Sequence, residues 1–68
     1  MYGRTWTYAF YDGEDLVQSI DLDGTDTAQK LRRELEASGT WVTRIEFRRL
    51  SGEWGLAWRE DQAEDRAA

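Results

Sequence analysis

The chain has 68 residues and a formal net charge of -5, with no cysteine and no histidine. Because disulfides need cysteine and the usual zinc sites need cysteine or histidine, these two means of stabilising a small domain are excluded. Its four tryptophans offer another means, since a buried aromatic side chain removes about 150 to 250 Å² from water. We therefore expect a single domain whose core depends on large aromatic residues.

The N-terminal part of the sequence predicts a β-hairpin. A strand is expected at about residues 4–11, where aromatic residues occupy every second position, and another at about residues 15–22. An Asp-Gly pair between them indicates a tight turn. Side-chain parity favours a three-residue loop, 11–13, with its glycine in the left-handed conformation and Tyr8 opposite Leu16. In that register the apolar side chains of both strands share one face.

The pattern then changes from strand to helix spacing. Apolar residues recurring every three or four positions predict a helix at about residues 27–38. Asp26 is the expected N-cap, because a carboxylate oxygen there can accept hydrogen bonds from the free backbone N–H groups of the first turn. Gly39 is expected to end the helix in the left-handed conformation.

The C-terminal part predicts a second hairpin. Strands are expected at about residues 40–50 and 53–59, joined by a two-residue turn at 51–52. This turn sets two apolar pairs opposite each other, Phe47 with Leu56 and Ile45 with Trp58. The alternation of both hairpins then places every tryptophan of the chain on the face that the helix covers, namely Trp6, Trp41, Trp54 and Trp58.

Together these elements predict an α+β domain of ββαββ order over residues 1–59, followed by a charged, disordered tail at 60–68. The hairpin-helix-hairpin order, the length and a tryptophan in the second hairpin resemble the immunoglobulin-binding B domains of streptococcal protein G, a minimal β-grasp. The resemblance implies the strand order 2-1-4-3, with the first and fourth strands parallel at the centre. It carries no functional motif, so immunoglobulin binding does not follow.

The sequence lacks the residue sets that common enzyme mechanisms use. Without histidine, cysteine or a glycine-rich phosphate loop, the usual nucleophiles and general acids and bases are missing. Residues 21–26 carry alternating aspartates, but a calcium loop starting at Asp21 would need glycine and glutamate where Asp26 and Arg32 stand. We therefore predict that the protein is not an enzyme and has no metal site and no cofactor.

The predicted protein-binding surface is the sheet face opposite the helix, the edge of the third strand or the helix itself, and the sheet face has the most suitable composition. Small side chains at its centre make a flat floor, charged residues of the second hairpin lie beside it, and an acidic run lies at the first turn. The candidate contact residues are Tyr11, Asp12, Glu14, Asp15, Val42, Arg44, Glu46, Arg48 and Arg59. The expected partner is another protein, or a second copy that pairs through this face or through the edge of the third strand.

Two further interpretations start from charge. A basic patch on the third and fourth strands would bind nucleic acid through Arg44, Arg48, Arg49 and Arg59, although an acidic chain is a poor binder of phosphate backbones. Alternatively, the acidic block at 12–26 and the acidic tail would imitate a phosphate backbone, as small inhibitors encoded by phages and mobile elements do. The favoured hypothesis remains an accessory or inhibitory module that binds a protein.

Membrane insertion is not expected. No apolar run approaches the roughly 20 residues of a membrane span, and the N-terminus lacks the basic and hydrophobic blocks of a signal peptide. These features predict a cytoplasmic protein.

Overall fold

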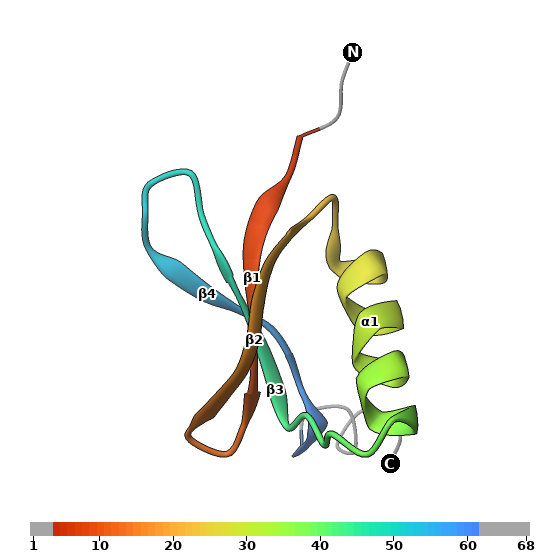
Figure 1. Ribbon diagram of the computed structural model, residues 1–68. Coiled ribbons are helices and arrows are strands. Elements are labelled where there is room, and N and C mark those ends of the chain that lie inside the picture. The colour runs from red at the N-terminus through yellow and green to blue at the C-terminus, as the bar shows by residue number, and fades with distance from the viewer. Residues whose placement is uncertain (1–3, 62–68) are drawn as a thin grey trace.

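The computed structural model describes residues 4–61, which form a four-stranded antiparallel sheet with one helix against one face (Figure 1). The ββαββ order and the α+β class agree with the sequence-based prediction. The elements are β1 (Trp6–Asp12), β2 (Asp15–Leu22), α1 (Thr25–Ala37), β3 (Arg44–Arg48) and β4 (Trp54–Arg59). The tail predicted at 60–68 lies outside the described residues beyond Asp61.

The order of the strands is β2-β1-β3-β4, which differs from the predicted 2-1-4-3 at the centre of the sheet. The strand beside β1 is β3, not β4, and the two are antiparallel. Because β2 and β3 lie on either side of β1 and run in the same direction, their connection needs a long crossover, which α1 supplies. The predicted third-strand edge does not exist, since β3 is paired on both sides.

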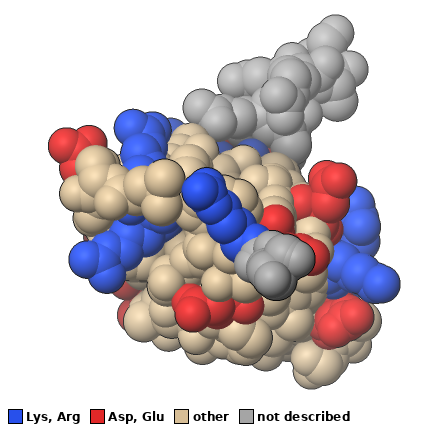
Figure 2. All heavy atoms as spheres, turned by 90° about the horizontal axis from the view of Figure 1, so that it is seen from above, with Lys and Arg blue, Asp and Glu red and all other residues tan. Residues whose placement is uncertain are grey.

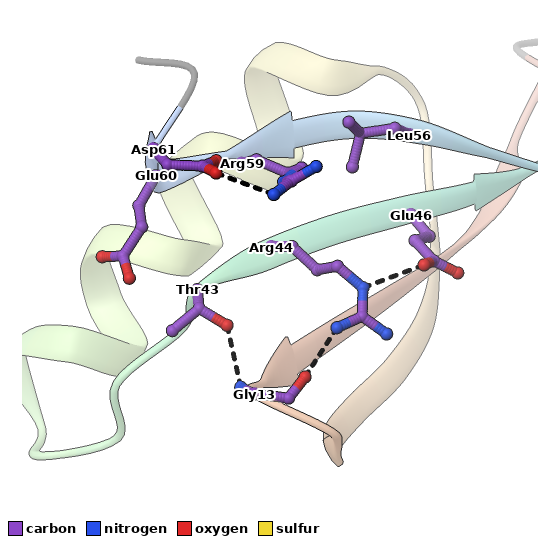
Figure 3. Close-up of a pocket in the computed structure, with 8 residues that line it drawn as sticks. All are labelled: Gly13, Thr43, Arg44, Glu46, Leu56, Arg59, Glu60 and Asp61. Carbon is purple, nitrogen blue, oxygen red and sulfur yellow. Dashed lines mark hydrogen bonds and ion pairs between the residues drawn. The ribbon is translucent and has the colours of Figure 1, made fainter. Parts of the chain in front are cut away.

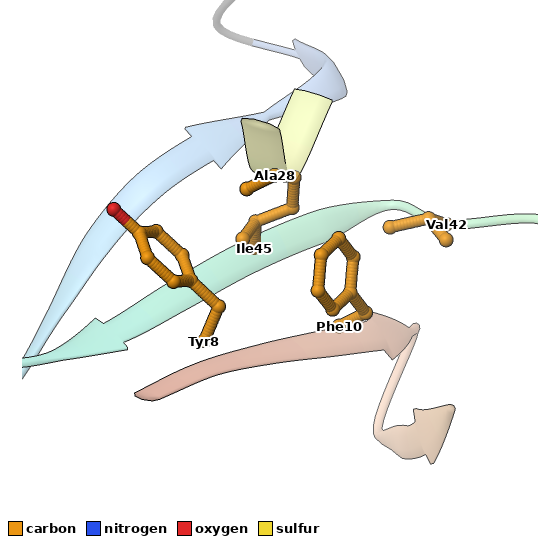
Figure 4. Close-up of a cluster of buried hydrophobic side chains, with 5 residues drawn as sticks. All are labelled: Tyr8, Phe10, Ala28, Val42 and Ile45. Atoms are coloured by element: carbon orange, nitrogen blue, oxygen red, sulfur yellow. The ribbon is translucent and has the colours of Figure 1, made fainter. Parts of the chain in front are cut away.

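The core lies between the sheet and α1 (Figure 4). Its buried side chains come from β1, from α1, from β3 and from the segment before β3: Tyr8, Phe10, Ala28, Val42 and Ile45. The prediction placed Val42 on the opposite face as part of a strand beginning at residue 40. That placement is wrong, because β3 begins only at Arg44 and Val42 lies in a non-strand segment that turns its side chain into the core.

The first hairpin has a shorter turn and a different register from those predicted. Gly13 and Glu14 form the turn, and Gly13 has the expected left-handed conformation, with φ of 64°. Tyr8 pairs with Ile20 rather than with Leu16, which lies opposite Tyr11. A β-bulge at Val17 separates these two registers, so Ile20 faces the helix while Leu16 lies on the other face.

The second hairpin has a three-residue loop, Leu50 to Gly52, instead of the predicted two-residue turn. The Arg49 N–H donates to the Glu53 carbonyl at 2.7 Å and closes the loop, and Gly52 is left-handed with φ of 95°. The extra loop residue shifts the register by one, so Phe47 pairs with Gly55 and not with Leu56. A bulge at Ala57 restores the register, and the predicted pairing of Ile45 with Trp58 is confirmed.

The shifted register places the tryptophans on different surfaces. Trp6 and Trp58 pack against the core, and the Arg32 guanidinium lies 4.3 Å from the centre of the Trp58 ring. Trp54 is 48% exposed because it lies between the three-residue loop and the bulge, on the face away from α1. Trp41 is 55% exposed in the connection that precedes β3. The expectation that all four tryptophans are buried is therefore wrong for Trp41 and Trp54.

The helix begins earlier than predicted. Gly24 is the N-cap residue and makes no side-chain hydrogen bond, while Asp26, the expected cap, lies within the first turn. A carboxylate there still interacts favourably with the helix dipole. The Thr27 hydroxyl donates to the Asp23 carboxylate at 2.5 Å, which fixes the entry to the helix. Gly39 follows the helix with φ of 101°, which confirms the expected left-handed end.

Deleting Ala57 is expected to be tolerated, because this residue is the extra one in the bulge. Without it Leu56 and Trp58 keep their partners Glu46 and Ile45 in an uninterrupted ladder. We expect urea unfolding to show a loss of about 1 kcal/mol, mainly from the packing of Ala57 against the core.

The matched control is deletion of Glu46, which lies in β3 and is paired on both sides. That deletion must turn either Ile45 or Phe47 to the wrong face and is expected to prevent folding. Equal damage from the two deletions would contradict the assignment of Ala57 as a bulge.

Candidate functional site

The sheet face opposite α1 is uncovered within residues 4–61, and we call it the outer face (Figure 1). Its strand positions follow from the registers of the four strands. They are Thr7, Ala9, Tyr11, Leu16, Ser19, Asp21, Arg44, Glu46, Arg48, Trp54, Leu56 and Arg59. Three of these, Leu16, Trp54 and Leu56, are large apolar side chains that are more than one-third exposed.

Arg44 lies at the start of β3, at one end of the outer face, and is held by three contacts. Its guanidinium carbon is 4.1 Å from the centre of the Tyr11 ring. Its Nε donates to Glu46 Oε2 at 2.9 Å, and its Nη1 donates to the Gly13 carbonyl at 2.6 Å. A stacked arginine with two hydrogen bonds has few rotamers left, so its planar donor group is already oriented.

Arg59 is directly opposite Arg44 on the neighbouring strand. Its Nη2 donates to Asp61 Oδ2 at 2.7 Å, and both side chains of this pair are largely exposed. The two arginines line an open groove of about 530 Å³ at the end of the sheet (Figure 3). The other lining residues are Gly13, Thr43, Glu46, Leu56, Glu60 and Asp61.

Hydrogen bonds join the first turn to the beginning of β3 and so form one end of the groove. The Gly13 N–H donates to Thr43 Oγ1 at 2.8 Å, and the Thr43 N–H donates to the Tyr11 carbonyl at 2.8 Å. On the other side of Thr43, its carbonyl accepts from the Glu60 N–H at 3.1 Å. The acidic turn, the start of β3 and the end of β4 are therefore held together around the groove.

The structure brings together four of the predicted contact residues, places the three acidic ones at the adjoining first turn and separates Arg48 and Val42 from them. Tyr11, Arg44, Glu46 and Arg59 are neighbours at one end of the outer face. Arg48 lies at the far end of β3, opposite Trp54. The acidic candidates Asp12, Glu14 and Asp15 are exposed at the first turn, and Val42 is excluded as a contact residue because it is fully buried.

Sequence reasoning missed the apolar part of the outer face. In the sequence, the apolar pattern of every second residue includes Leu16 in the second strand and Trp54 and Leu56 in the fourth. This pattern therefore assigned them to the core-facing side. No residue type marks the bulges at Val17 and Ala57 that turn them outward. The composition did contain one indication of an interface, because the chain has eight arginines and only one lysine. Arginine is enriched and lysine depleted at protein interfaces.

Basic and acidic side chains are interspersed on the molecule and do not form a single basic surface in the view along the sheet from above (Figure 2). Two outer-face arginines already contact carboxylates, Arg44 with Glu46 and Arg59 with Asp61. Such pairing lowers the positive potential available to a polyanion. The outer face is therefore a mixed apolar and charged surface.

The aspartates considered for calcium have partners of other kinds. Asp21 accepts a hydrogen bond from the Thr7 hydroxyl at 2.8 Å, and Asp23 accepts one from Thr27. Across residues 4–61 no three potential metal-ligating side chains are grouped closely enough to hold an ion. Within the same range, no helix has the length and apolar character that crossing a membrane requires.

Comparisons of the chain with protein family models, with curated proteins and with solved structures found no match. The functional argument therefore depends on the outer face and its groove alone.

Proposed function

We propose that the protein is a non-enzymatic module that binds another protein through its outer face. The observation that carries this proposal is the exposure of Trp54, Leu56 and Leu16 on the one sheet face that α1 leaves uncovered. Exposed apolar side chains next to arginine and tyrosine have the composition of an interface, where aromatic residues and arginine are enriched. A small protein that covers part of another protein in this way would act as an accessory or inhibitory factor.

Trp54 is the expected centre of the contact. Its indole is about half exposed and lies on the outer face opposite Arg48, with Leu56 two residues further along β4. Tryptophan and arginine are the residues most often found to dominate binding free energy, because a large rigid surface is buried at a small entropic cost. The arginines imply a partner surface that combines apolar residues with carboxylates.

Replacing Trp54 with serine is expected to weaken partner binding by at least about 30-fold, the effect of a 2 kcal/mol contact. The partner is first identified by placing a photoreactive phenylalanine analogue at position 54 in the source cells and sequencing the cross-linked protein. Isothermal titration calorimetry of the purified partner then compares the wild type with the Trp54→Ser variant.

Trp41→Ser is the matched control, because Trp41 is similarly exposed but lies off the sheet in the connection before β3. It is expected to leave the affinity within about threefold of the wild-type value. Equal effects of the two variants, or cross-links only from position 41, would contradict the proposal. A cross-link to a second copy of the chain, with dimers in sedimentation, would identify the outer face as a homodimer interface instead.

Nucleic-acid binding is the second candidate, and one observation favours it. Exposed Trp54 lies opposite Arg48, so an aromatic surface for base stacking stands beside a basic side chain. A salt titration with single-stranded DNA and RNA tests this candidate. A site that contacts four phosphates should show a log-log slope near -3 to -4, whereas the protein-binding proposal expects no binding at low salt.

A further inference from the structure

We propose that the groove between Arg44 and Arg59 binds a carboxylate group of the protein partner, and that Asp61 occupies this position when the partner is absent. The proposal rests on the proposed protein-binding function and specifies the chemistry of its partner. It assigns a role to a groove on the outer face that combines charged side chains with an apolar wall.

The first observation is the direct opposition of two like charges. Arg44 and Arg59 are cross-strand partners, an arrangement that destabilises a sheet unless an anion lies between or beside the two guanidinium groups. In the structure each arginine has found a carboxylate of the chain, Glu46 for Arg44 and Asp61 for Arg59. Both arginines therefore already form ion pairs with carboxylates, which is the chemistry that we propose for the ligand.

The second observation is that the two arginines differ in how firmly they are held. Arg44 is fixed by the Tyr11 ring, by Glu46 and by the Gly13 carbonyl, which engage its Nε and Nη1. Within residues 4–61 no hydrogen bond uses the Nη2 of Arg44, so this nitrogen can donate to a ligand. Among the side-chain contacts within residues 4–61, Arg59 has one hydrogen bond, from Nη2 to Asp61, and its side chain is about half exposed. A fixed donor beside a movable one can close around an incoming group.

The third observation concerns Asp61. Its side chain is 60% exposed, and it is only two residues from Arg59, so the ion pair is local and accessible to water. Exposed ion pairs of this kind contribute little to stability. A carboxylate from a partner can therefore replace Asp61 at Arg59 without loss of a strong interaction. Asp61 is an internal competitor for the same donor atoms.

The charge of the groove favours a carboxylate over a phosphate. Its two arginines face three carboxylates, Glu46, Glu60 and Asp61, so the lining has a formal charge of -1. A dianionic phosphate would be repelled by this surplus of negative charge. A carboxylate carries one negative charge, and when it displaces Asp61 it forms a new ion pair with Arg59 in place of the one that is broken. Leu56 forms the apolar wall, which suits an acidic residue followed by an apolar one.

The test is an NMR titration of the full chain with acetyl-Glu-Leu-amide, followed through the arginine Nε–Hε signals. We expect saturable shifts of the Arg44 and Arg59 signals and none for Arg48 and Arg49. The matched probe acetyl-Gln-Leu-amide, which lacks the carboxylate, should cause no shift. In the Asp61→Asn variant the dissociation constant should fall about two- to fivefold, because the internal competitor is gone.

Three results would overturn the proposal. They are equal shifts of all arginines, stronger binding of inorganic phosphate than of the dipeptide, or an unchanged or raised dissociation constant in Asp61→Asn. The titration does not use the partner, so its outcome is separate from that of the Trp54 experiment. If the dipeptide binds but partner binding does not depend on Trp54, the carboxylate site is supported and the proposed function is contradicted. If the dipeptide does not bind but partner binding depends on Trp54, the carboxylate site is contradicted and the proposed function is supported.

Discussion

Replacing Phe10 with alanine is expected to lower the free energy of unfolding by about 3–5 kcal/mol. Phe10 is fully buried and lies opposite Ile45 in the middle of the sheet, so the substitution leaves a cavity that few neighbours can fill. At about 0.05 to 0.15 kcal/mol per residue, a chain of 68 residues has a total stability of only about 3–10 kcal/mol. Urea denaturation followed by far-UV circular dichroism should therefore show a largely unfolded variant or a much lower midpoint.

Trp54→Ala is the matched control, because it also removes an aromatic side chain from a strand. Its effect should be below about 1 kcal/mol, since the indole is half exposed on the outer face. If Trp54→Ala proved as damaging as Phe10→Ala, the assignment of Trp54 to the outer face would be wrong.

Replacing Val42 with aspartate is expected to abolish folding at neutral pH. The Val42 side chain is completely buried beside the core aromatics, and the core contains no buried polar or charged residue among those described. An unpaired carboxylate in such surroundings costs several kcal/mol, either as buried charge or as the work of protonating it. Circular dichroism and the dispersion of the amide NMR signals would report the loss directly.

Leu16→Asp is the corresponding control, because Leu16 is 57% exposed on the outer face. It should fold with a midpoint close to that of the wild type. The two variants distinguish the structure from the sequence-based prediction, because the prediction has Val42 exposed and Leu16 buried. Normal folding of Val42→Asp would restore the sequence-based placement.

Much of the fold could be predicted because local chemistry determines it. The period of the apolar residues identified four strands and one helix, and β2 has the predicted bounds, Asp15–Leu22. Gly13 and Gly39 are left-handed as expected, since a positive φ has a low cost only for glycine. Register was harder, because it depends on loop length and bulges, which small changes in turn geometry decide. Leu50 belongs to the loop and no sequence feature indicated that.

Strand order could not be predicted for a different reason. β3 alternates apolar and charged residues, and β4 alternates large apolar residues with small ones. Each strand therefore has one face of large apolar side chains, so either could have paired with β1. The structure places β3 there, where Ile45 becomes fully buried, and leaves β4 at the edge, where Trp54 and Leu56 remain partly exposed. The choice depends on the total packing of the two arrangements, which no local pattern expresses.

The candidate site shows the same division. Tyr11, Arg44, Glu46 and Arg59 were assigned to the outer face by side-chain alternation, and the structure places them there. Arg44, Glu46 and Arg59 lie outside the segments between a bulge and a misassigned turn. Tyr11 keeps its predicted face because the extra residue of the first bulge lies in β2 and not in β1. Trp54 and Leu56 do lie in such a segment, and they were therefore assigned to the opposite face.

The two bulges have a consequence for solubility. Val17 and Ala57 lie in β2 and β4, the two outermost strands of the sheet. A free edge offers unpaired backbone groups to any other strand, and proteins commonly guard such edges with proline, charge or a local break in regularity. This chain has no proline, and its bulges supply that break on both sides. Edge-to-edge growth into fibrils or larger sheets is thereby hindered, while the outer face stays open for specific contacts.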